Sequence, residues 1–233
     1  MKAVILAGGK GTRLAPYTTI FPKPLMPLGE KPILEIVIRQ LKLCGFTEII
    51  LAVGYLSELI KAYFHDGRSL GIKISYSKES KALGTAGPLS LIEGLNETFL
   101  VMNGDILTTI PYLKLVKYHI AKKGIATIAV HRRMLDVDFG VITVGKGNNI
   151  SSYLEKPKLH YDVSMGIYVF DPGVLKYIFR NKQLDFPDLI NKLLRAKEKV
   201  CAYISNDHWL DIGRHDDYET AQKEFRKIEK KLI

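Results

Sequence analysis

The chain has 233 residues, of which 47% are hydrophobic and 25% are charged. These fractions are ordinary for a globular protein, and they exclude a disordered chain, a collagen-like chain and a small disulfide scaffold. The net charge of +10 would suit a polyanionic ligand, but many of the lysines line helix faces, so nucleic acid is not an expected partner. No apolar stretch approaches the roughly 18–20 residues that cross a bilayer, so we expect no membrane association.

The two cysteines, Cys44 and Cys201, fall in a helical pattern and a strand pattern. They are typical of buried free thiols in a reducing compartment. The apolar start of the chain breaks at Gly8, which leaves it shorter than the core of about 7–15 residues in a secretory signal. We therefore expect a cytoplasmic protein.

Short β-branched runs alternate with helical patterns in the first half of the chain. Such units predict a parallel sheet with helices on both faces. Right-handed crossovers would place the loops that follow the strands at one edge, where ligands bind in folds of this kind. The expected strands cover residues 3–7, 48–53, 72–77 and 98–102, and the expected helices cover 33–44, 57–64 and 85–93.

The second half is less regular and predicts a mixed sheet. No linker, internal repeat or low-complexity tract divides the chain, so residues 1–233 are expected to form one domain. The predicted fold class is α/β, a doubly wound, mostly parallel, Rossmann-like sheet with an inserted mixed-sheet lobe on the substrate side. Helices are expected over residues 113–122, 174–179, 188–195 and 216–230, and strands over 126–131, 141–144, 152–154, 164–170 and 200–204.

A glycine-rich loop follows the first strand, with Gly8, Gly9 and Gly11 in four positions. Backbone amides in such a loop can approach an anion closely because no Cβ intervenes. With Thr12 and Arg13 added, the loop could cradle a triphosphate. It matches neither the dinucleotide fingerprint nor the Walker loop. A tight turn would account for two of the glycines, but not for the arginine at the ligand edge.

Lys23 stands between two prolines, ten residues after this loop. Proline on both sides restricts the backbone and removes helical alternatives. A lysine held in this way can aim its ammonium group at a phosphate. A lone lysine in a proline-rich loop would otherwise be read as ordinary surface.

The segment Leu-Ala-Gly-Gly-Lys-Gly-Thr-Arg-Leu, followed by Pro-Lys-Pro, resembles the signature of the sugar-1-phosphate nucleotidyltransferases, also called nucleoside-diphosphate-sugar pyrophosphorylases. The resemblance extends to about residue 221. The motif Leu-Gly-Thr-Ala-Gly-Pro-Leu at residues 83–89 is most similar to the mannose-1-phosphate guanylyltransferases. Further motifs of the family follow in order at residues 83–88, 103–105, 155–157, 165–168 and 209–213.

The resemblance implies transfer of a nucleotidyl group from a nucleoside triphosphate to a sugar 1-phosphate. The sugar phosphate would attack the α-phosphorus in line, and pyrophosphate would leave. Arg13 would bind the pyrophosphate, and Lys23 would neutralise charge on the α-phosphate. Residues 1–110 would mainly bind the nucleotide, and residues 111–233 would mainly bind the sugar phosphate.

Asp105 and Asp211 are the expected ligands of Mg²⁺. Each follows a strand pattern, and two carboxylates with phosphate oxygens and water suit this ion. The assignment rests mainly on the resemblance. The alternatives are an Asx-turn at Asp105 and a helix cap at Asp211.

The resemblance assigns the binding residues to two groups. At the position of Ser164 the family often has asparagine. Neighbouring strand residues point to opposite faces, so a local kink must bring Glu155 and Lys156 to one site. The nucleotide-binding residues are Leu6, Ala7, Gly8, Gly9, Gly11, Thr12, Arg13, Glu79, Gly84, Thr85, Asn103, Gly104 and Asp105, and the sugar-phosphate-binding residues are Gly140, Glu155, Lys156, Ser164 and Gly166.

Glu79 lies five residues before Gly84, where the family reads the base. A carboxylate can accept hydrogen bonds from both N1–H and N2–H₂ of guanine, whereas an amide would better suit uracil or thymine. GTP is therefore the preferred triphosphate, with a mannose-type or other hexose or heptose 1-phosphate. Uridylyl, thymidylyl and cytidylyl transfer remain alternatives, as does base reading by the backbone near Gly84.

Three other interpretations stay open. Asp136 and Asp138 form a carboxylate pair of the kind that metal-dependent glycosyltransferases use, although Arg13 and Lys23 argue against that class. A sensor that binds nucleotide sugars without turnover is a second alternative, and a zinc site near His215 is a third. The oligomeric state is open, and a homo-oligomer is compatible with the sequence.

Overall fold

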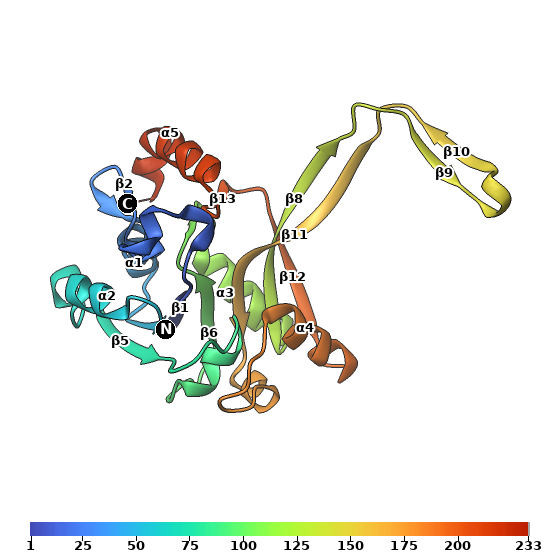
Figure 1. Ribbon diagram of the computed structural model, residues 1–233. Helices are drawn as coiled ribbons and strands as arrows, with labels where there is room; N and C mark the ends of the chain where they lie inside the picture. Colours follow the sequence, from blue (N-terminus) through green and yellow to red (C-terminus); the bar gives the residue numbers. More distant parts are fainter. Residues whose placement is uncertain (233) are drawn as a thin grey trace.

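The computed structural model describes residues 1–232. Helices and strands alternate through the first half, and strands dominate the second half (Figure 1). The strands are β1 (Lys2–Ala7), β2 (Pro27–Leu28), β3 (Lys31–Pro32), β4 (Glu48–Val53), β5 (Lys73–Lys78), β6 (Phe99–Asn103), β7 (Ile106–Thr108), β8 (Ala126–Asp136), β9 (Val141–Val144), β10 (Ile150–Leu154), β11 (Lys158–Phe170), β12 (Val200–Ser205) and β13 (Trp209–Asp211). The helices are α1 (Ile33–Leu43), α2 (Ser57–Phe64), α3 (Tyr112–Lys122), α4 (Phe186–Arg195) and α5 (His215–Leu232).

The central sheet has seven strands in the order β12-β8-β11-β6-β1-β4-β5. β1 pairs in parallel with β4 and β6, β4 with β5, and β8 with β12. Only β11 runs antiparallel to its two neighbours, β6 and β8. The α/β class with a mostly parallel Rossmann-like sheet is therefore confirmed, and strands from the second half extend the same sheet.

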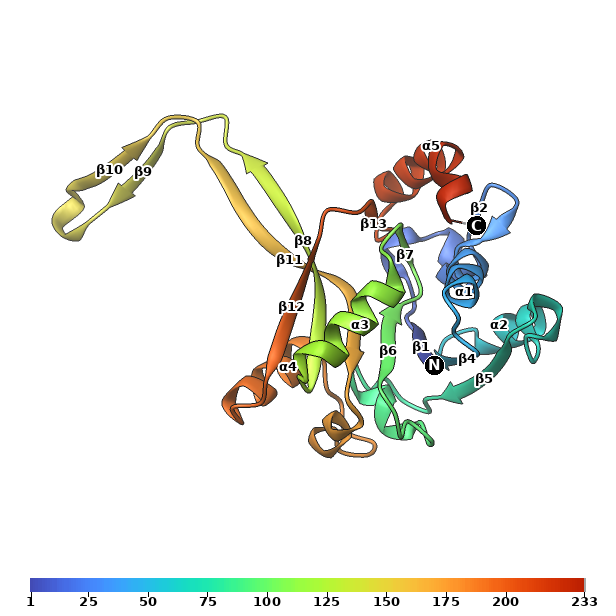
Figure 2. The ribbon, with the colours of Figure 1, turned by 180° about the vertical axis from the view of Figure 1, so that it is seen from behind.

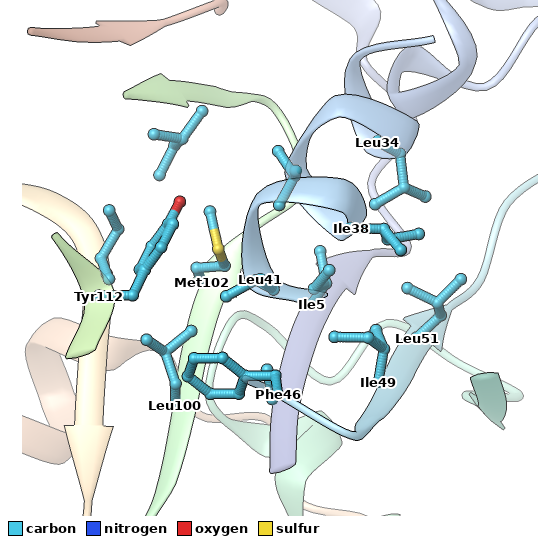
Figure 3. Packing of buried hydrophobic residues seen from close by; sticks show 14 of the residues in the cluster. Ile5, Leu34, Ile38, Leu41, Phe46, Ile49, Leu51, Leu100, Met102 and Tyr112 are labelled. Atoms are coloured by element: carbon cyan, nitrogen blue, oxygen red, sulfur yellow. The ribbon is translucent and has the colours of Figure 1, made fainter. Parts of the chain in front are cut away.

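Two apolar layers cover the faces of this sheet because residues of buried strands alternate between them. Ile5 faces one layer, formed with α1, α2 and α3, and Val4 faces the other, formed with α4. Figure 3 shows the first layer, where Leu41 of α1 and Tyr112 of α3 pack over the strands. These layers hold the carboxyl ends of β1, β4 and β6 in fixed positions.

A third apolar cluster attaches α5 to the carboxyl edge of the sheet. Phe225 packs there with Leu14 and Leu28, and with Ile212 beyond the end of β13. β13 in turn pairs antiparallel with β7. The end of the chain is therefore brought back to the segment that follows β6.

A long β-arm leaves the sheet (Figures 1 and 2). We use this name for residues 132–163, which comprise the outer parts of β8 and β11 and the hairpin of β9 and β10. β8 and β11 pair out to Asp136 and Lys158, and β9 and β10 continue beyond them. The expected substrate-side lobe thus takes the form of an arm whose outermost residues, 137–157, include none that is buried.

Two expected helices are wrong as α-helices. Residues 85–93 contain a 3₁₀ turn at Gly87–Leu91, and residues 174–179 overlap a 3₁₀ segment at Pro172–Tyr177. In the first of these, the amides of Ala86 and Gly87 both donate to the carbonyl of Leu184, each at 2.9 Å. Within residues 1–232, no helix has the length and apolar character needed to cross a bilayer.

Candidate active site

A cavity of about 480 Å³ opens at the carboxyl ends of β1, β4 and β6. It lies where ligands bind in open α/β sheets. All thirteen residues expected to bind the nucleotide line this cavity, together with Lys23. The lining residues are Leu6, Ala7, Gly8, Gly9, Gly11, Thr12, Arg13, Lys23, Pro24, Ala52, Val53, Glu79, Ala82, Gly84, Thr85, Pro88, Asn103, Gly104 and Asp105.

The glycine loop packs directly against the proline-flanked lysine. Gly11 has φ of +63°, and a Cβ added there would lie 3.0 Å from Thr18 and 3.2 Å from Lys23. The Thr18 hydroxyl donates to the Gly11 carbonyl at 2.8 Å. Only glycine meets both the dihedral angle and the close approach without strain. The loop and Lys23 therefore form one unit on the cavity wall.

Lys23 is buried, with its side chain only 10% exposed, and its ammonium donates to Oδ2 of Asp105. The lysine lies in a 3₁₀ turn at Lys23–Leu25, which ends in extended backbone at Met26. Because a buried charge without a partner is costly, the ion pair fixes both side chains at the cavity. A substrate phosphate could bind the Lys23 ammonium together with Asp105, or in its place.

The β7–β13 ladder places Asp211 beside Asp105. Asp211 pairs with Ile106, and the amide of Ile212 donates to the carbonyl of Asp105 at 3.1 Å. Surrounding protein atoms partly desolvate the Asp211 carboxylate and raise its pKa, and the charge of Asp105 raises it further, while Lys23 and Arg13 oppose these effects. Charges more than 100 residues from Asp211 in sequence thus act on it at this edge.

The carboxylate pair fits a divalent cation that also binds substrate phosphates. Oδ1 of Asp105 is buried and accepts no hydrogen bond within the described chain, so a lone-pair position is free for a ligand. Among residues 1–232, no group of three or more His, Cys, Asp or Glu side chains could hold a metal by itself. Mg²⁺ commonly takes one or two carboxylates and completes its shell with phosphate oxygens and water.

Glu79 reaches the cavity from the end of β5. Its Oε2 accepts from the amide of Leu83 at 3.0 Å. Its Oε1 lies close to the glycine loop, because a Cβ added at Gly8 would come within 3.1 Å of it. One carboxylate oxygen therefore fixes the following loop, while the other lies beside Gly8 and Gly54 and makes no hydrogen bond to Leu83.

Thr85 has a structural role that the sequence did not indicate. Its amide and hydroxyl both donate to Oδ1 of Asp185, at 2.8 and 3.1 Å, and its hydroxyl accepts from the amide of Phe186 at 2.8 Å. Asp185 was not among the expected site residues. Its place before Phe-Pro at a helix start was the available signal, since aspartate is a preferred N-cap. This network ties the cavity wall to α4.

The apolar wall of the cavity was also not predicted from the sequence. Ala52 and Val53 at the end of β4 line the cavity, as do Ala82 and Pro88. The carboxyl end of a central strand is the signal that could have found the first two. Small apolar side chains at this position leave room for a flat ring.

Two residues expected to bind the sugar phosphate lie next to the nucleotide cavity. Gly166 has φ of +70°, and a Cβ there would come within 2.7 Å of Nδ2 of Asn103. Its amide donates to the Ser164 hydroxyl at 3.3 Å, and that hydroxyl is 3.2 Å from the hydroxyl of Tyr168. The interrupted pairing of β11 with β8 between Ser164 and Tyr168 produces this geometry.

The other three lie on the β-arm, outside the cavity. Tyr153 donates to Oε2 of Glu155 at 3.1 Å, and a Cβ at Gly140 would lie 2.3 Å from the same hydroxyl. Lys156 has φ of +43°, a left-handed conformation that is uncommon for a side-chain-bearing residue. This is the expected kink before Pro157. Gly140, Glu155 and Lys156 are thus close to one another, but they do not line the cavity of their own chain.

Two alternatives find no geometric support. Asp136 pairs with Lys158 at 3.9 Å on the arm, away from the cavity lining. His215 Nε2 is 2.8 Å from the carbonyl of Ala15. Neither residue belongs to a cluster of three metal-binding side chains in the described part of the chain.

The sequence profile of the family described as "Nucleotidyl transferase" matches residues 2–228. The chain belongs to this family. It is 37% identical over 241 residues to a UTP–glucose-1-phosphate uridylyltransferase from Synechocystis sp., covering 95% of this chain and 62% of the relative. It is 36% identical over 230 residues to a probable mannose-1-phosphate guanylyltransferase from Oryza sativa, covering 95% and 63%. The chain thus spans somewhat less than two thirds of these nucleotidyltransferases.

Solved structures share the fold over nearly the whole chain. A putative glucose-1-phosphate thymidylyltransferase from Bacillus anthracis, in complex with sucrose, has a TM-score of 0.77 and 27% identity, covering 98% of this chain and 96% of the other. HddC from Yersinia pseudotuberculosis has a TM-score of 0.73 and 26% identity, covering 96% and 99%. Membership of the sugar-1-phosphate nucleotidyltransferases, expected from the sequence motifs, is confirmed.

Proposed function

We propose that this protein transfers a nucleotidyl group from a nucleoside triphosphate to a sugar 1-phosphate and releases pyrophosphate. One observation carries the proposal. The Lys23–Asp105 ion pair lines the same cavity as the glycine loop, and Asp211 lies beside Asp105 at its edge. A cation, a pair of carboxylates and a row of unhindered amides are what a triphosphate and its metal ion require.

The chain would act by positioning and charge stabilisation rather than by a covalent intermediate. The amides from Gly8 to Thr12 and the Arg13 guanidinium would hold the phosphates that leave. Lys23 would neutralise charge that develops on the α-phosphate during in-line attack by the sugar phosphate. Mg²⁺ held by Asp105 and Asp211 would offset phosphate charge.

We favour GTP as the triphosphate. The Oε1 atom of Glu79 is not engaged by Leu83, and a carboxylate oxygen suits the N–H donors on the Watson–Crick edge of guanine. The named relatives include both uridylyl and guanylyl transferases at similar identity, so the carboxylate is the argument for guanine. A mannose-type or other hexose or heptose 1-phosphate is the proposed acceptor.

The proposed compartment is the cytoplasm, where nucleoside triphosphates are available. Cys44 and Cys201 are both free thiols, which fits a reducing environment.

A panel assay tests the proposed function. Four triphosphates are each combined with several hexose and heptose 1-phosphates and Mg²⁺, and pyrophosphate release is measured. We expect release only when both substrates are present, and fastest with GTP. Release that needs no sugar phosphate, or transfer from a finished nucleotide sugar to another acceptor without pyrophosphate, would overturn the proposal.

A further inference from the structure

One face of the hairpin on the β-arm is apolar and uncovered. Ile142, Val144, Ile150 and Tyr153 are between 45% and 66% exposed. Ile150 pairs with Val144 and Tyr153 pairs with Ile142. Directly paired residues lie on the same face of a ladder, and so do residues two apart along a strand. The four side chains therefore share one face.

The opposite face of the hairpin is polar in its middle. Thr143 pairs with Ser152 there, and the Ser152 hydroxyl donates to that of Thr143 at 2.8 Å. The next pair on that face, Val141 with Leu154, is apolar and lies at the base of the hairpin. Over the outer part of the hairpin, the alternation is typical of strands that pack on another surface. An isolated two-stranded hairpin is only marginally stable in water. The arm therefore needs an apolar surface to cover.

A second uncovered apolar patch lies beside the cavity. Tyr17, Ile20 and Phe21 are between 50% and 73% exposed, and they belong to the segment that joins Arg13 to Lys23. The hydroxyl of Tyr55 donates to the carbonyl of Thr19 at 2.9 Å and fixes the middle of this segment. We call these three residues the rim patch.

The arm and the rim patch of one chain do not meet. In Figures 1 and 2 the arm extends away from the dark blue segment that carries the rim patch. β8 and β11 pair continuously from Ser164 to Lys158, which holds the arm in this direction. Its sugar-phosphate residues, Glu155 and Lys156, are consequently remote from their own nucleotide cavity.

The charge of the arm indicates what kind of partner it fits. Between residues 132 and 163 the chain has five lysines and arginines and four aspartates and glutamates, although the whole chain carries +10. A nearly neutral apolar surface does not suit nucleic acid or an anionic membrane. It suits a second copy of this chain, which presents the rim patch and lacks Glu155 and Lys156 at its own cavity.

We propose that two copies exchange their arms. The apolar face of each hairpin packs on the rim patch of the other copy, and Glu155 and Lys156 complete the sugar-phosphate site at that copy's cavity. The inference rests on the proposed function, because it uses the sugar-phosphate role of these two residues. A two-fold axis makes the exchange reciprocal, so that both patches on both copies become covered.

The base of the hairpin, at Gly140 and residues 153–156, has a fixed local structure. The Tyr153–Glu155 hydrogen bond and the close approach of Gly140 hold the Glu155 carboxylate, and the backbone at the next residue, Lys156, is left-handed. A side-chain-bearing residue in this conformation costs free energy. Docking of the arm on another copy would explain why this strained segment is kept although it lies in solvent in the single chain.

The first test compares two neighbouring positions on β9. Ile142→Glu places a charge in the apolar face, whereas Thr143→Glu places it on the opposite face. We expect the unmodified chain and Thr143→Glu to form dimers, measured by light scattering across a concentration series, and Ile142→Glu to be monomeric. A monomeric unmodified chain, or equal behaviour of the two variants, would overturn the exchange.

The second test separates exchange from folding of the arm back on its own chain. Lys23→Ala, defective in the cavity, and Lys156→Ala, defective in the arm, are co-expressed with different tags, and the mixed dimer is isolated by two affinity steps. Exchange gives the mixed dimer one intact site, so we expect about half the unmodified turnover per dimer. If each arm serves its own chain, the mixed dimer stays as inactive as the two parents.

These results are distinct from a failure of the proposed function. An unmodified chain that releases no pyrophosphate with any substrate pair would contradict the proposed function, while the comparison of Ile142→Glu with Thr143→Glu would still decide whether the arm joins two copies. Unmodified activity in Lys156→Ala would show that the arm completes no site and would overturn the exchange.

Discussion

Lys23 illustrates how neighbouring residues hold one side chain in place at this cavity. Prolines and the close contact with Gly11 hold its backbone, and Asp105 holds its ammonium. A divalent cation at Asp105 would compete with the ammonium for the same carboxylate and would repel it. A phosphate oxygen is then the natural new partner of Lys23. On the proposed function, the ion pair therefore holds the lysine next to the position where charge would develop.

Replacement of this lysine tests its role directly. Lys23→Ala should lower turnover by about 10²-fold or more, because charge developing at the α-phosphate loses its partner. The matched control is Lys73→Ala, which removes the same charge at the far, amino-terminal end of β5. Steady-state pyrophosphate release measures both. Similar turnover in the two variants would remove Lys23 from the mechanism.

Glu79→Gln tests base selection. The amide keeps the size of the side chain but removes the negative charge that guanine donors favour. We expect the ratio of kcat/KM for GTP to that for UTP to fall about tenfold, the equivalent of weakening one charge-assisted hydrogen bond. An unchanged ratio would transfer base reading to the backbone near Gly84.

Much of the cavity could be predicted from the sequence because its residues follow strands. The glycine loop, Glu79 and Asn103 each stand at the carboxyl end of an expected strand, where the topology brings them together. Asp185 could not be found this way, since its link to Thr85 joins residues 100 apart. The periodicity of apolar residues along the chain does not predict a hydrogen bond of this kind.

At the scale of elements, regular segments were predictable and irregular ones were not. The expected strand at Glu48–Val53 and the expected helix at Ser57–Phe64 have the observed bounds, since each has a clear apolar pattern. Residues 85–93 were also expected to be helical, but the amides of Ala86 and Gly87 donate to the carbonyl of Leu184 instead. Tertiary hydrogen bonds of this kind override local preference.

α3 carries a buried histidine that makes the fold sensitive to acid. Nδ1 of His119 is 2.9 Å from the hydroxyl of Thr127 on β8. Burial lowers the pKa of His119, and the charge of Asp171 opposes this only in part. Below the ordinary value of about 6.5, the unfolded chain binds a proton that the folded chain resists. Stability should therefore be lost as the pH falls through this region.

His119→Asn should reduce this pH dependence. The variant should be less stable at about pH 7.5, by roughly 1–2 kcal/mol for a buried polar replacement, but should lose less further stability between about pH 7 and pH 5. Thermal unfolding at a series of pH values measures both effects. An equally steep loss in the variant would place the acid sensitivity elsewhere.

At the scale of the whole molecule, the chain separates into a compact body and an arm. The hairpin strands of the arm were expected at residues 141–144 and 152–154, but the continuation of β8 beyond His131 and the start of β11 before Ser164 were not. The direction of the arm was not predicted either, because the sequence pattern does not encode where a hairpin points. The body contains the complete nucleotide cavity. The arm contains three of the five residues expected to bind the sugar phosphate.

Removal of the outer arm should separate binding from transfer. Residues 137–157 can be replaced by Asn-Gly, which closes a hairpin between the paired residues Asp136 and Lys158. Because none of the removed residues is buried within its own chain, the body should still fold, although loss of the exchanged dimer should lower its melting temperature. Triphosphate affinity, measured by calorimetry, should persist, while transfer should fall by about 10²-fold or more. Unchanged transfer would contradict a role for the arm.

A crystal structure with Mg²⁺ and a non-hydrolysable GTP analogue would locate the triphosphate in the cavity. We expect the phosphates to lie against the amides of residues 8–12, the Lys23 ammonium to contact them, and a metal ion to lie between Asp105 and Asp211. A nucleotide bound elsewhere, with the glycine loop free of phosphate, would contradict this expectation.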